Sequence, residues 1–201
     1  MQELLLATQN PGKRREIQAL LVGLPLKLVL PSELGISLEV LEDGSTYAEN
    51  AIKKVKAFYS ASHMAVLADD SGLEVNALDG APGLHSARYS PQPGASDADR
   101  RKLLIANLEG IPRPWTAHFH CTVAISNADG LIQLAEGNCF GQIIPEERGS
   151  NGFGYDPIFL LDDIQKTMAE LSMDEKNQLS HRAKAILAAR PILAETFKLD
   201  L

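Results

Sequence analysis

The chain has 201 residues, of which 45% are hydrophobic and 22% are charged. This length and composition suit a globular protein with one sizeable core and exclude a disordered or fibrous chain. The formal net charge of −7 argues against non-specific binding to a nucleic acid polymer, which favours a basic excess. A small anionic ligand stays compatible, because a few basic groups in one cleft can outweigh the global charge. We expect a single domain over residues 1–201.

The sequence contains neither a membrane anchor nor a secretory signal that we can identify. No apolar run approaches the roughly 20 residues of a membrane span, and the N-terminus lacks a basic region before its short apolar run. The two cysteines, Cys121 and Cys139, belong to no metal or redox motif. Reduced thiols in a cytoplasmic protein fit best, and a single bridge between the two is the alternative.

Apolar runs and helical periodicities alternate along the chain, which predicts an α/β protein with one continuous mixed sheet. Turn signals, the helix cap Asn10 and the capping box of Thr46 and Glu49 set boundaries. The predicted strands cover residues 3–8, 26–30, 64–68, 73–77, 116–126, 131–135, 139–144 and 158–161. The predicted helices cover residues 11–24, 46–60, 96–108 and 172–189, with a short final helix from residue 191.

The first of four loops with candidate chemistry joins the first predicted strand to the first helix. Backbone N–H groups at a helix N-terminus attract anions, Lys13 adds a positive charge, and Thr8 offers a hydroxyl. The loop lacks the glycine spacing of a Walker A motif. It is either a phosphate cradle or an ordinary capped turn, and its residues are Thr8, Gln9, Asn10, Pro11, Gly12 and Lys13.

The second loop places Asp69 and Asp70 before Ser71, at the predicted end of a strand. Adjacent carboxylates repel one another and are tolerated where a cation or hydrogen bonds compensate. Because neighbouring residues of a strand point to opposite faces, we expect one carboxylate to face a site and the other to cap a turn. Mg²⁺ favours one or two carboxylates plus substrate phosphates, and Glu42 or Asp43 could supply the second one. A solvated turn is the alternative.

The third loop, residues 152–157, places glycines on either side of Phe153. An open aromatic ring can stack on a nucleobase, an interaction worth roughly 1–3 kcal/mol. Asp156 could accept hydrogen bonds from base N–H groups. The alternative is a tight turn whose aromatic rings fill the core, which we favour for Tyr155.

The fourth segment holds Lys176, His181 and Arg182. Lys176 can pair with a phosphate, and the other two can donate to a carbonyl acceptor. On one continuous helix Lys176 and Arg182 would lie about 120° apart, so they would not share a face. Either the ligand is wrapped or Lys176 lies near the helix entry. Taken alone, Lys176 is more simply a solvated surface lysine.

Together, and in this order, these segments resemble the inosine/xanthosine triphosphate pyrophosphatase family, whose members are dITP/XTP pyrophosphatases. The resemblance spans residues 8–182, and the combination is specific although each part is short. The matching pieces are Thr8-x-Asn10-x-x-Lys13, Ala68-Asp-Asp-Ser-Gly-Leu73, Gly80-Ala-Pro-Gly83, Ser86-Ala-Arg-Tyr89, Gly152-Phe-Gly-Tyr-Asp-Pro157 and Ser180-His-Arg182.

The resemblance implies a Mg²⁺-dependent enzyme that cleaves ITP, dITP and XTP to the monophosphate and pyrophosphate. It also implies an elongated mixed sheet flanked by helices, two lobes with a central substrate cleft, and a homodimer. Two departures stand out: Gln9 and Asn151 occupy positions where many members have glycine. Neither removes a chemical group, so we expect activity to survive.

Residue roles follow from the resemblance. Glu42 and Asp70 would hold Mg²⁺, Asp70 would accept the proton, and residues 8–13 would hold the triphosphate. A carboxylate against Mg²⁺ is a weak base, so Asp69 is the other candidate for that task. The remaining substrate-binding residues would be Ser71, Phe153, Gly154, Tyr155, Asp156, Lys176, His181 and Arg182.

Two other functions compete with this reading. One is a pyrophosphatase of modified or ordinary pyrimidine nucleoside triphosphates, against which Phe153, His181 and Arg182 argue mildly. The other is a non-catalytic nucleotide sensor, against which the retained Glu42 and Asp70 argue, because binding alone needs no base.

Overall fold

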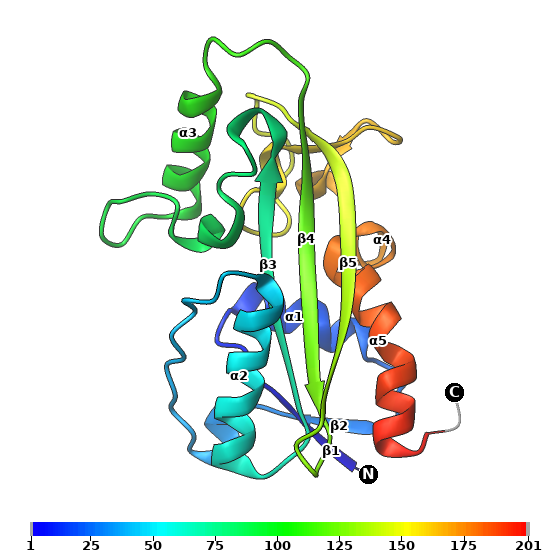
Figure 1. Ribbon diagram of the computed structural model, residues 1–201. Coiled ribbons are helices and arrows are strands. Elements are labelled where there is room, and N and C mark those ends of the chain that lie inside the picture. The colour runs from blue at the N-terminus through cyan, green and yellow to red at the C-terminus, as the bar shows by residue number, and fades with distance from the viewer. Residues whose placement is uncertain (1, 200–201) are drawn as a thin grey trace. The chain divides into compact units, whose positions relative to one another are not determined.

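The computed structural model describes residues 2–199 and places their strands in one seven-stranded mixed sheet, in the order β2-β1-β3-β4-β5-β6-β7 (Figure 1). Strand β1 pairs in parallel with β2 and β3, whereas β6 pairs antiparallel with β5 and β7. The strands are β1 (Gln2–Leu6), β2 (Leu26–Val29), β3 (Val66–Val75), β4 (Trp115–Ser126), β5 (Ile132–Ile143), β6 (Phe159–Leu161) and β7 (Lys166–Thr167). The α-helices are α1 (Pro11–Leu20), α2 (Tyr47–Ser62), α3 (Asp97–Leu108), α4 (Met173–Leu179) and α5 (His181–Phe197). The predicted α/β class with a mixed sheet is confirmed.

The chain divides into two compact units. The strands β3, β4 and β5 each contribute residues to both units, so the boundary between the units falls within these three strands. Unit 1 consists of Met1–Asp70, Cys121–Gly137 and Arg182–Leu201, and unit 2 of Ser71–His120 and Asn138–His181.

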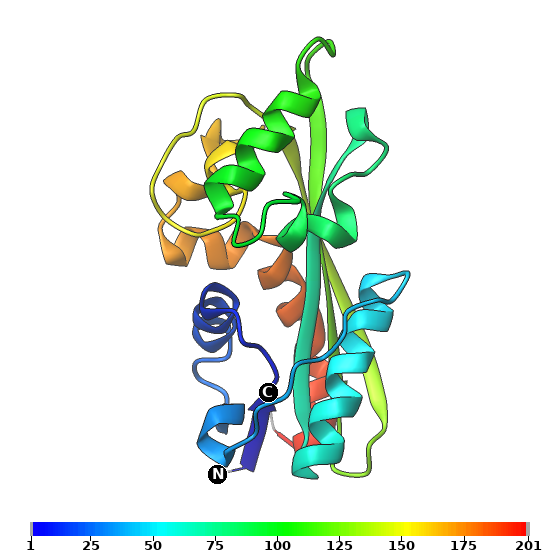
Figure 2. The ribbon, with the colours of Figure 1, turned by 90° about the vertical axis from the view of Figure 1, so that its left-hand side faces the viewer.

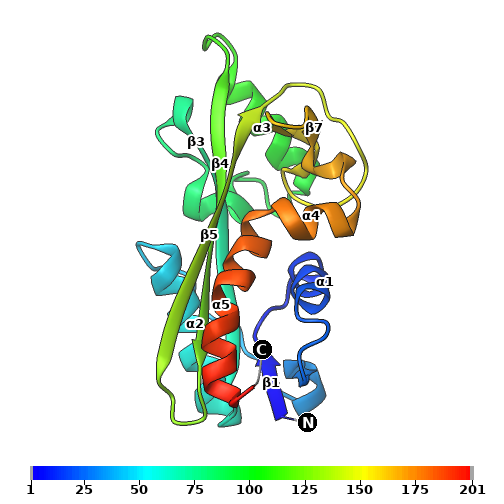
Figure 3. The ribbon, with the colours of Figure 1, turned by 90° about the vertical axis from the view of Figure 1, so that its right-hand side faces the viewer.

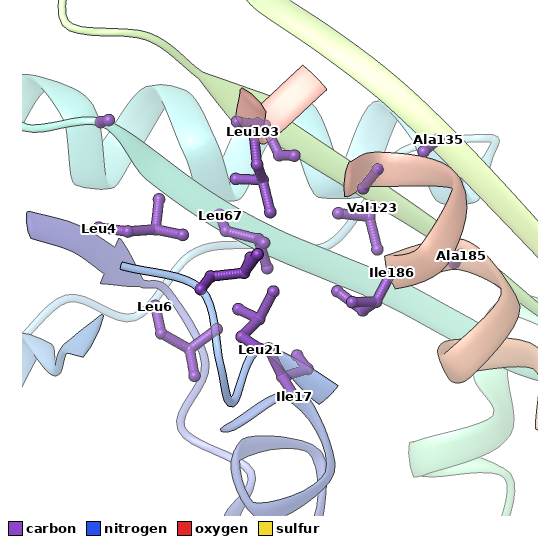
Figure 4. Packing of buried hydrophobic residues seen from close by; sticks show 14 of the residues in the cluster. Leu4, Leu6, Ile17, Leu21, Leu67, Val123, Ala135, Ala185, Ile186 and Leu193 are labelled. Carbon is purple, nitrogen blue, oxygen red and sulfur yellow. The ribbon is translucent and has the colours of Figure 1, made fainter. Parts of the chain in front are cut away.

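Unit 1 buries both faces of its part of the sheet. Successive residues of β1 alternate: Leu4 and Leu6 pack in a cluster with α1 and α5, and Leu5 packs in a second cluster with α2. Figures 2 and 3 show α2 and α5 on opposite faces of these strands, and Figure 4 shows the side chains of the first cluster. A strand covered on both sides reads as a continuous apolar run, which explains the sequence of β1.

Unit 2 has its own apolar core. Leu104 and Leu108 of α3 pack with Trp115 and Phe119 of β4 and with residues that follow β5. Ser96 caps α3 and shares a capping box with Asp99, as its sequence predicts. This core supports the glycine-rich loop at residues 149–157, because Tyr155 and Ile158 belong to it.

Two predicted strand boundaries are wrong. Residues 69–72 form no turn: β3 continues through them, because Asp69 and Asp70 are buried and their charges are compensated inside unit 1. Residues 131–135 and 139–144 are not two strands either, since β5 runs through both as one strand with alternating burial. In the sequence, polar residues at these positions indicated turns. In the fold, they lie within strands.

The predicted helix over residues 172–189 is also wrong. Ser180 has an extended backbone and separates α4 from α5, and no separate helix begins at Pro191, which lies inside α5. Pro191 and Leu187, the residue four positions earlier, are both exposed, so the proline lies on the solvent side of α5. A proline is least disruptive there, since water can hydrogen-bond the carbonyl that loses its partner.

Two further sequence interpretations can be compared with the described residues. Cys121 and Cys139 are both buried and form no disulfide, as the reduced-thiol interpretation expects. Within residues 2–199, no helix is both long enough and apolar enough to cross a bilayer.

Candidate functional site

The loop between β1 and α1 is held by its own polar side chains. Asn10 caps α1, and its Oδ1 accepts hydrogen bonds from the N–H groups of Gly12 at 2.8 Å and Lys13 at 3.1 Å. Thr8 Oγ1 accepts from the Asn10 N–H at 3.2 Å, and Gln9 donates to the Leu38 carbonyl at 2.8 Å. Asn10 therefore takes two of the N–H groups that the phosphate-cradle interpretation invoked, and Lys13 is the loop's cationic group.

Lys13 points to one face of β3, where Asp69 is buried among positive charges. The Nζ of Lys13 lies 3.0 Å from Asp69 Oδ2, and Nε of Arg182 lies 3.2 Å from the same oxygen. Arg182 also forms a charged hydrogen bond with Glu16, and the side chains of Asp69, Arg182 and Glu16 are all at most 3% exposed. The Oδ1 atom of Asp69 is buried and accepts no hydrogen bond from the described residues.

The charges around Asp69 set its protonation state. Burial alone would raise its pKa, but Lys13, Arg182 and Lys54 outweigh burial and hold the pKa of Asp69 well below its usual range. The pKa of Arg182 is raised, because Asp69 and Glu16 outweigh the effect of its own burial. Asp69 and Arg182 are therefore both ionised at neutral pH.

Asp70 faces the opposite side of β3 and meets a different set of groups. Asn50 Nδ2 donates to Asp70 Oδ2 at 3.0 Å, and Lys54 Nζ lies 3.4 Å from Asp70 Oδ1. The same Nζ lies 3.3 Å from Glu42 Oε2. Burial lowers the pKa of Lys54, but Asp70, Asp69 and Glu42 raise it further, so the ammonium group stays charged. Asp43, the other acidic candidate, pairs with Lys53 instead.

These contacts test whether Asp70 and Glu42 can hold a cation. Their carboxylates converge on one positive group, the Lys54 ammonium, so the geometry already brings two oxygen ligands to a cation. Mg²⁺ commonly uses one or two protein carboxylates, with water and substrate phosphates as its other ligands. The described residues contain no group of three or more His, Cys, Asp or Glu able to hold a metal ion. The pair fits a metal ion that arrives with a phosphate substrate.

A second group of candidate residues lies in unit 2. Lys176 Nζ lies 2.5 Å from Asp156 Oδ2, and both side chains are at most 5% exposed. The same oxygen accepts the Phe153 N–H at 2.8 Å, and Lys176 Nζ lies 5.2 Å from the centre of the Phe153 ring. Gly152 is required here, since a Cβ at this position would lie 2.0 Å from Asp156 Oδ2. The three residues Phe153, Asp156 and Lys176 form one connected cluster.

Other residues of this region have structural contacts. Tyr155 is buried in the core and its hydroxyl donates to the Ser86 carbonyl at 2.9 Å, as the core interpretation of this residue expects. His181 is buried and stacks on Phe119, with ring centres 4.7 Å apart. Ser71 lies next to Asp70 on β3 and is partly buried.

The break at Ser180 settles the geometric problem posed by Lys176 and Arg182. Lys176 belongs to α4 and is buried, whereas Arg182 lies in the first turn of α5. The Ser180 N–H donates to the Lys176 carbonyl at 2.9 Å, which ends α4. The two side chains therefore need not share a helix face, and Lys176 is not a solvated surface lysine.

Sequence reasoning missed three polar residues that the site uses. Asn50 and Lys54 are spaced i, i+4 on the same buried side of α2 as Ala51, and that spacing was the available signal. Glu16 lies three residues after Lys13 in α1 and is only 2% exposed. Nothing in the sequence distinguished Glu16 from a surface glutamate.

Fold and residues together define an α/β protein that gathers carboxylates and basic groups on both faces of one strand. The model of the Ham1 family matches residues 4–192, and the chain belongs to this family. It is 47% identical over 192 residues to the dITP/XTP pyrophosphatase of Desulforamulus reducens, covering 95% of each chain. It is 43% identical to that of Bacillus subtilis, covering 92% of this chain and 94% of the relative. A solved HAM1 protein from Coxiella burnetii is 40% identical, with a TM-score of 0.87 over 97% of this chain and 100% of that one.

Proposed function

We propose that this protein is a nucleoside triphosphate pyrophosphatase that hydrolyses ITP, dITP and XTP to the monophosphate and pyrophosphate. The observation that carries the proposal is the convergence of Asp70 and Glu42 on one cation, in a chain 47% identical to a dITP/XTP pyrophosphatase. Phosphoanhydride hydrolysis needs such a place, because charge on the phosphates must be balanced while water attacks phosphorus.

The triphosphate end of the substrate is assigned to residues of unit 1. Glu42 and Asp70 would hold Mg²⁺, with the segment from Thr8 to Lys13 beside the phosphates. When bound between these residues and the substrate, the metal ion would balance charge on the phosphates and make a water easier to deprotonate. Lys54 would then exchange its contacts with the carboxylates for contacts with phosphate oxygens, since an ammonium needs a negative partner when a metal ion takes its place.

Asp70 is the better candidate for the proton acceptor. Asp69 contacts Lys13 and Arg182 directly and its pKa is held low, so its carboxylate is a poor base. Asp70 contacts one amide and one ammonium group, and its side chain is 9% exposed. The carboxylate that accepts the proton must reach water, and Asp70 meets that requirement better than Asp69.

The base is assigned to the glycine-rich loop and to the segment that begins α5. Phe153 would stack on the purine, and Gly154, Tyr155 and Asp156 would contribute backbone and carboxylate contacts. Ser71 would also touch the substrate, and Lys176 would pair with a phosphate. His181 and Arg182 would donate to the 6-oxo group, which adenine replaces with an amino donor. A buried donor left unpaired against ATP costs roughly 1–3 kcal/mol, which favours 6-oxo purines.

The proposal also covers the oligomeric state and the cellular location of the protein. The resemblance supports a homodimer, which light scattering of the purified protein would test against a monomer. A cytoplasmic place of action is supported by two cysteines that form no disulfide.

The deciding experiment measures pyrophosphate release from ITP, XTP, GTP, ATP and dUTP, with Mg²⁺ and with a chelator. Strong metal-dependent release from ITP and XTP is expected, with little from ATP or dUTP. Equal release from every base would remove the base-reading roles of His181 and Arg182. Tight ITP binding without release would make the protein a nucleotide sensor, and preferential release from dUTP would make it a pyrimidine enzyme.

A further inference from the structure

Two side chains near the start of α3, those of Asp97 and Arg101, hydrogen-bond to the same residue of the glycine-rich loop, Gly154. Asp97 Oδ2 accepts the Gly154 N–H at 2.8 Å, and Arg101 Nη1 donates to the Gly154 carbonyl at 2.8 Å. Both peptide units that flank Gly154 are therefore fixed by side chains from one helix. Figure 2 shows α3 beside the segment that carries this loop.

Each of these two side chains is itself restrained. Arg101 makes a two-pronged ion pair with Glu147, with N–O distances of 2.8 and 2.9 Å. Asp97 pairs with Arg100 as well, and Arg100 donates to the Ala95 carbonyl at 2.8 Å. Partial burial raises the pKa of Asp97, but hydrogen bonds from Arg100 and Gly154 outweigh it, so the carboxylate stays ionised at neutral pH. The hydrogen bonds to the N–H and to the carbonyl of Gly154 therefore both involve a charged side chain, which strengthens them.

Gly154 is a point where the loop needs such restraint. Its φ of +61° lies in the left-handed region, and no atom of the described residues lies within 4 Å of the place where a Cβ would be. No side-chain packing at that position restrains the residue. The peptide that Asp97 binds is the one joining Phe153 to Gly154, so fixing it also fixes the backbone on which the Phe153 ring is mounted.

We propose that Asp97 and Arg101 are positioning residues that strengthen purine binding by holding Phe153 in place for stacking. The inference rests on the proposed function and extends it to a helix that no substrate-binding assignment includes. The other end of the loop is fixed separately, by the Phe153 N–H to Asp156 bond. Asp97 and Arg101 add the second anchor that fixes the direction of the ring.

The helix does not need these contacts for its own folding. Ser96 and Asp99 satisfy its N-terminus, and Leu104 and Leu108 bury its apolar side. This separation provides a matched control: Asp99→Ala weakens the same helical turn but leaves the contacts with Gly154. Asp97→Ala removes the acceptor of the Gly154 N–H, whereas Asp97→Asn keeps an oxygen acceptor and should restore most of the function.

The test compares kcat and KM for ITP in the wild type, in these three variants and in Arg101→Met. Asp97→Ala should raise the KM for ITP by about tenfold, with kcat changed about twofold or less, because a misplaced ring weakens binding more than chemistry. Arg101→Met should act in the same direction. Asp99→Ala and Asp97→Asn should keep the KM for ITP within about twofold of the wild type.

A double-mutant cycle tests whether Asp97 acts through Phe153. In a Phe153→Ala background, Asp97→Ala should raise the KM for ITP by no more than about twofold further, because its target is gone. A full tenfold rise in that background, or an unchanged KM in Asp97→Ala itself, would overturn the inference. Failure of the wild type to hydrolyse ITP would instead overturn the proposed function. Amide hydrogen exchange then tests the contact without substrate, since Asp97→Ala should accelerate exchange at Gly154 and Asp99→Ala should not.

Discussion

Asp69 and Asp70 are neighbours on β3, yet the two faces of this strand give them opposite surroundings. Asp69 has a side chain that is 0% exposed and lies within 3.2 Å of both Lys13 and Arg182. Asp70 is 9% exposed and meets one amide and the Lys54 ammonium, which it shares with Glu42. One carboxylate is neutralised by cations fixed in the interior. The other is balanced by a single lysine that reaches it from α2.

The difference shows how one sequence element can serve stability and chemistry at once. Strand geometry sends successive side chains to opposite faces, so the neighbours share almost no contacts. On the Asp69 face, Glu16, Arg182 and Lys13 join α1, α5 and β3 by buried charges. On the Asp70 face, the charged groups are fewer and closer to solvent. We expect substitutions of the buried carboxylates Asp69 and Glu16 to act mainly on folding, and those of Asp70 and Glu42 to act mainly on turnover.

The largest expected effect is on turnover, at Asp70. Asp70→Asn keeps the size of the side chain and removes both the base and one metal-binding charge, so kcat for ITP should fall by about 10²–10⁴-fold. The free energy of unfolding should fall by about 1–3 kcal/mol, because Lys54 keeps Glu42 as a partner and an amide can still accept from Asn50. Steady-state pyrophosphate release and equilibrium unfolding on the same preparation decide the matter. Wild-type rates in this variant would remove the role assigned to Asp70.

The next effect in size is on stability, at Asp69 and Glu16. Asp69→Asn or Glu16→Gln leaves Arg182 buried with one carboxylate fewer, and removing a partner of a buried ion pair typically costs about 3–5 kcal/mol. Urea unfolding measures this loss. The exposed pair of Lys27 and Glu3 is the control, because Glu3→Gln should cost less than about 1 kcal/mol. If Asp69→Asn unfolded like the wild type but lost turnover, the two faces of β3 would have to exchange their assignments.

The sequence predicted the start of β3 and the opposite faces of its two carboxylates, but it did not predict that the strand continues beyond Asp70. The apolar run before Asp69 indicated a strand, and the alternation rule correctly placed the two carboxylates on opposite faces. The predicted turn was wrong because the partners of the carboxylates come from remote segments. Arg182 lies 113 residues from Asp69, and no local pattern reveals such a contact.

The same reason explains the residues that were found and those that were missed. Glu42 and Asp70 were predicted to act together, and the structure brings both to Lys54. Lys54 itself went unnoticed, because a lysine in an amphipathic helix usually faces water. Its neutralisation by Glu42 and Asp70 is a tertiary property. The break of the helix at Ser180 was hidden as well, since serine carries no strong signal inside a helical pattern.

A smaller effect is expected in the pH dependence of the free energy of unfolding, to which Asp69 should contribute. The pKa of Asp69 is lowered in the folded protein, so its contribution to stability is present above the unfolded value of about 3.9 and is lost as the pH falls through the folded value. The free energy of unfolding should therefore decrease as the solution is acidified below about pH 4. Asp69→Asn should make this decrease less steep. Urea titrations between pH 3 and pH 7 would measure both slopes, and equal slopes in Asp69→Asn and wild type would contradict the charge balance assigned to this face.

The smallest effect concerns a reporter on the Asp69 face. Cys121 is fully buried with its Sγ 3.9 Å from Asp69 Oδ2, and burial together with the Asp69 charge raises the pKa of the thiol to about 12. The thiolate is the reactive form, so alkylation of native protein at pH 8 should not modify Cys121, whereas urea-unfolded protein should react fully. Peptide mapping after alkylation separates this residue from Cys139. In Asp69→Asn, labelling in mild urea should begin at a lower denaturant concentration, because the buried charges that close this face are no longer balanced. Labelling of Cys121 in the native wild type would show instead that this face opens readily, and the contrast between the two sides of β3 would be smaller than their exposure suggests.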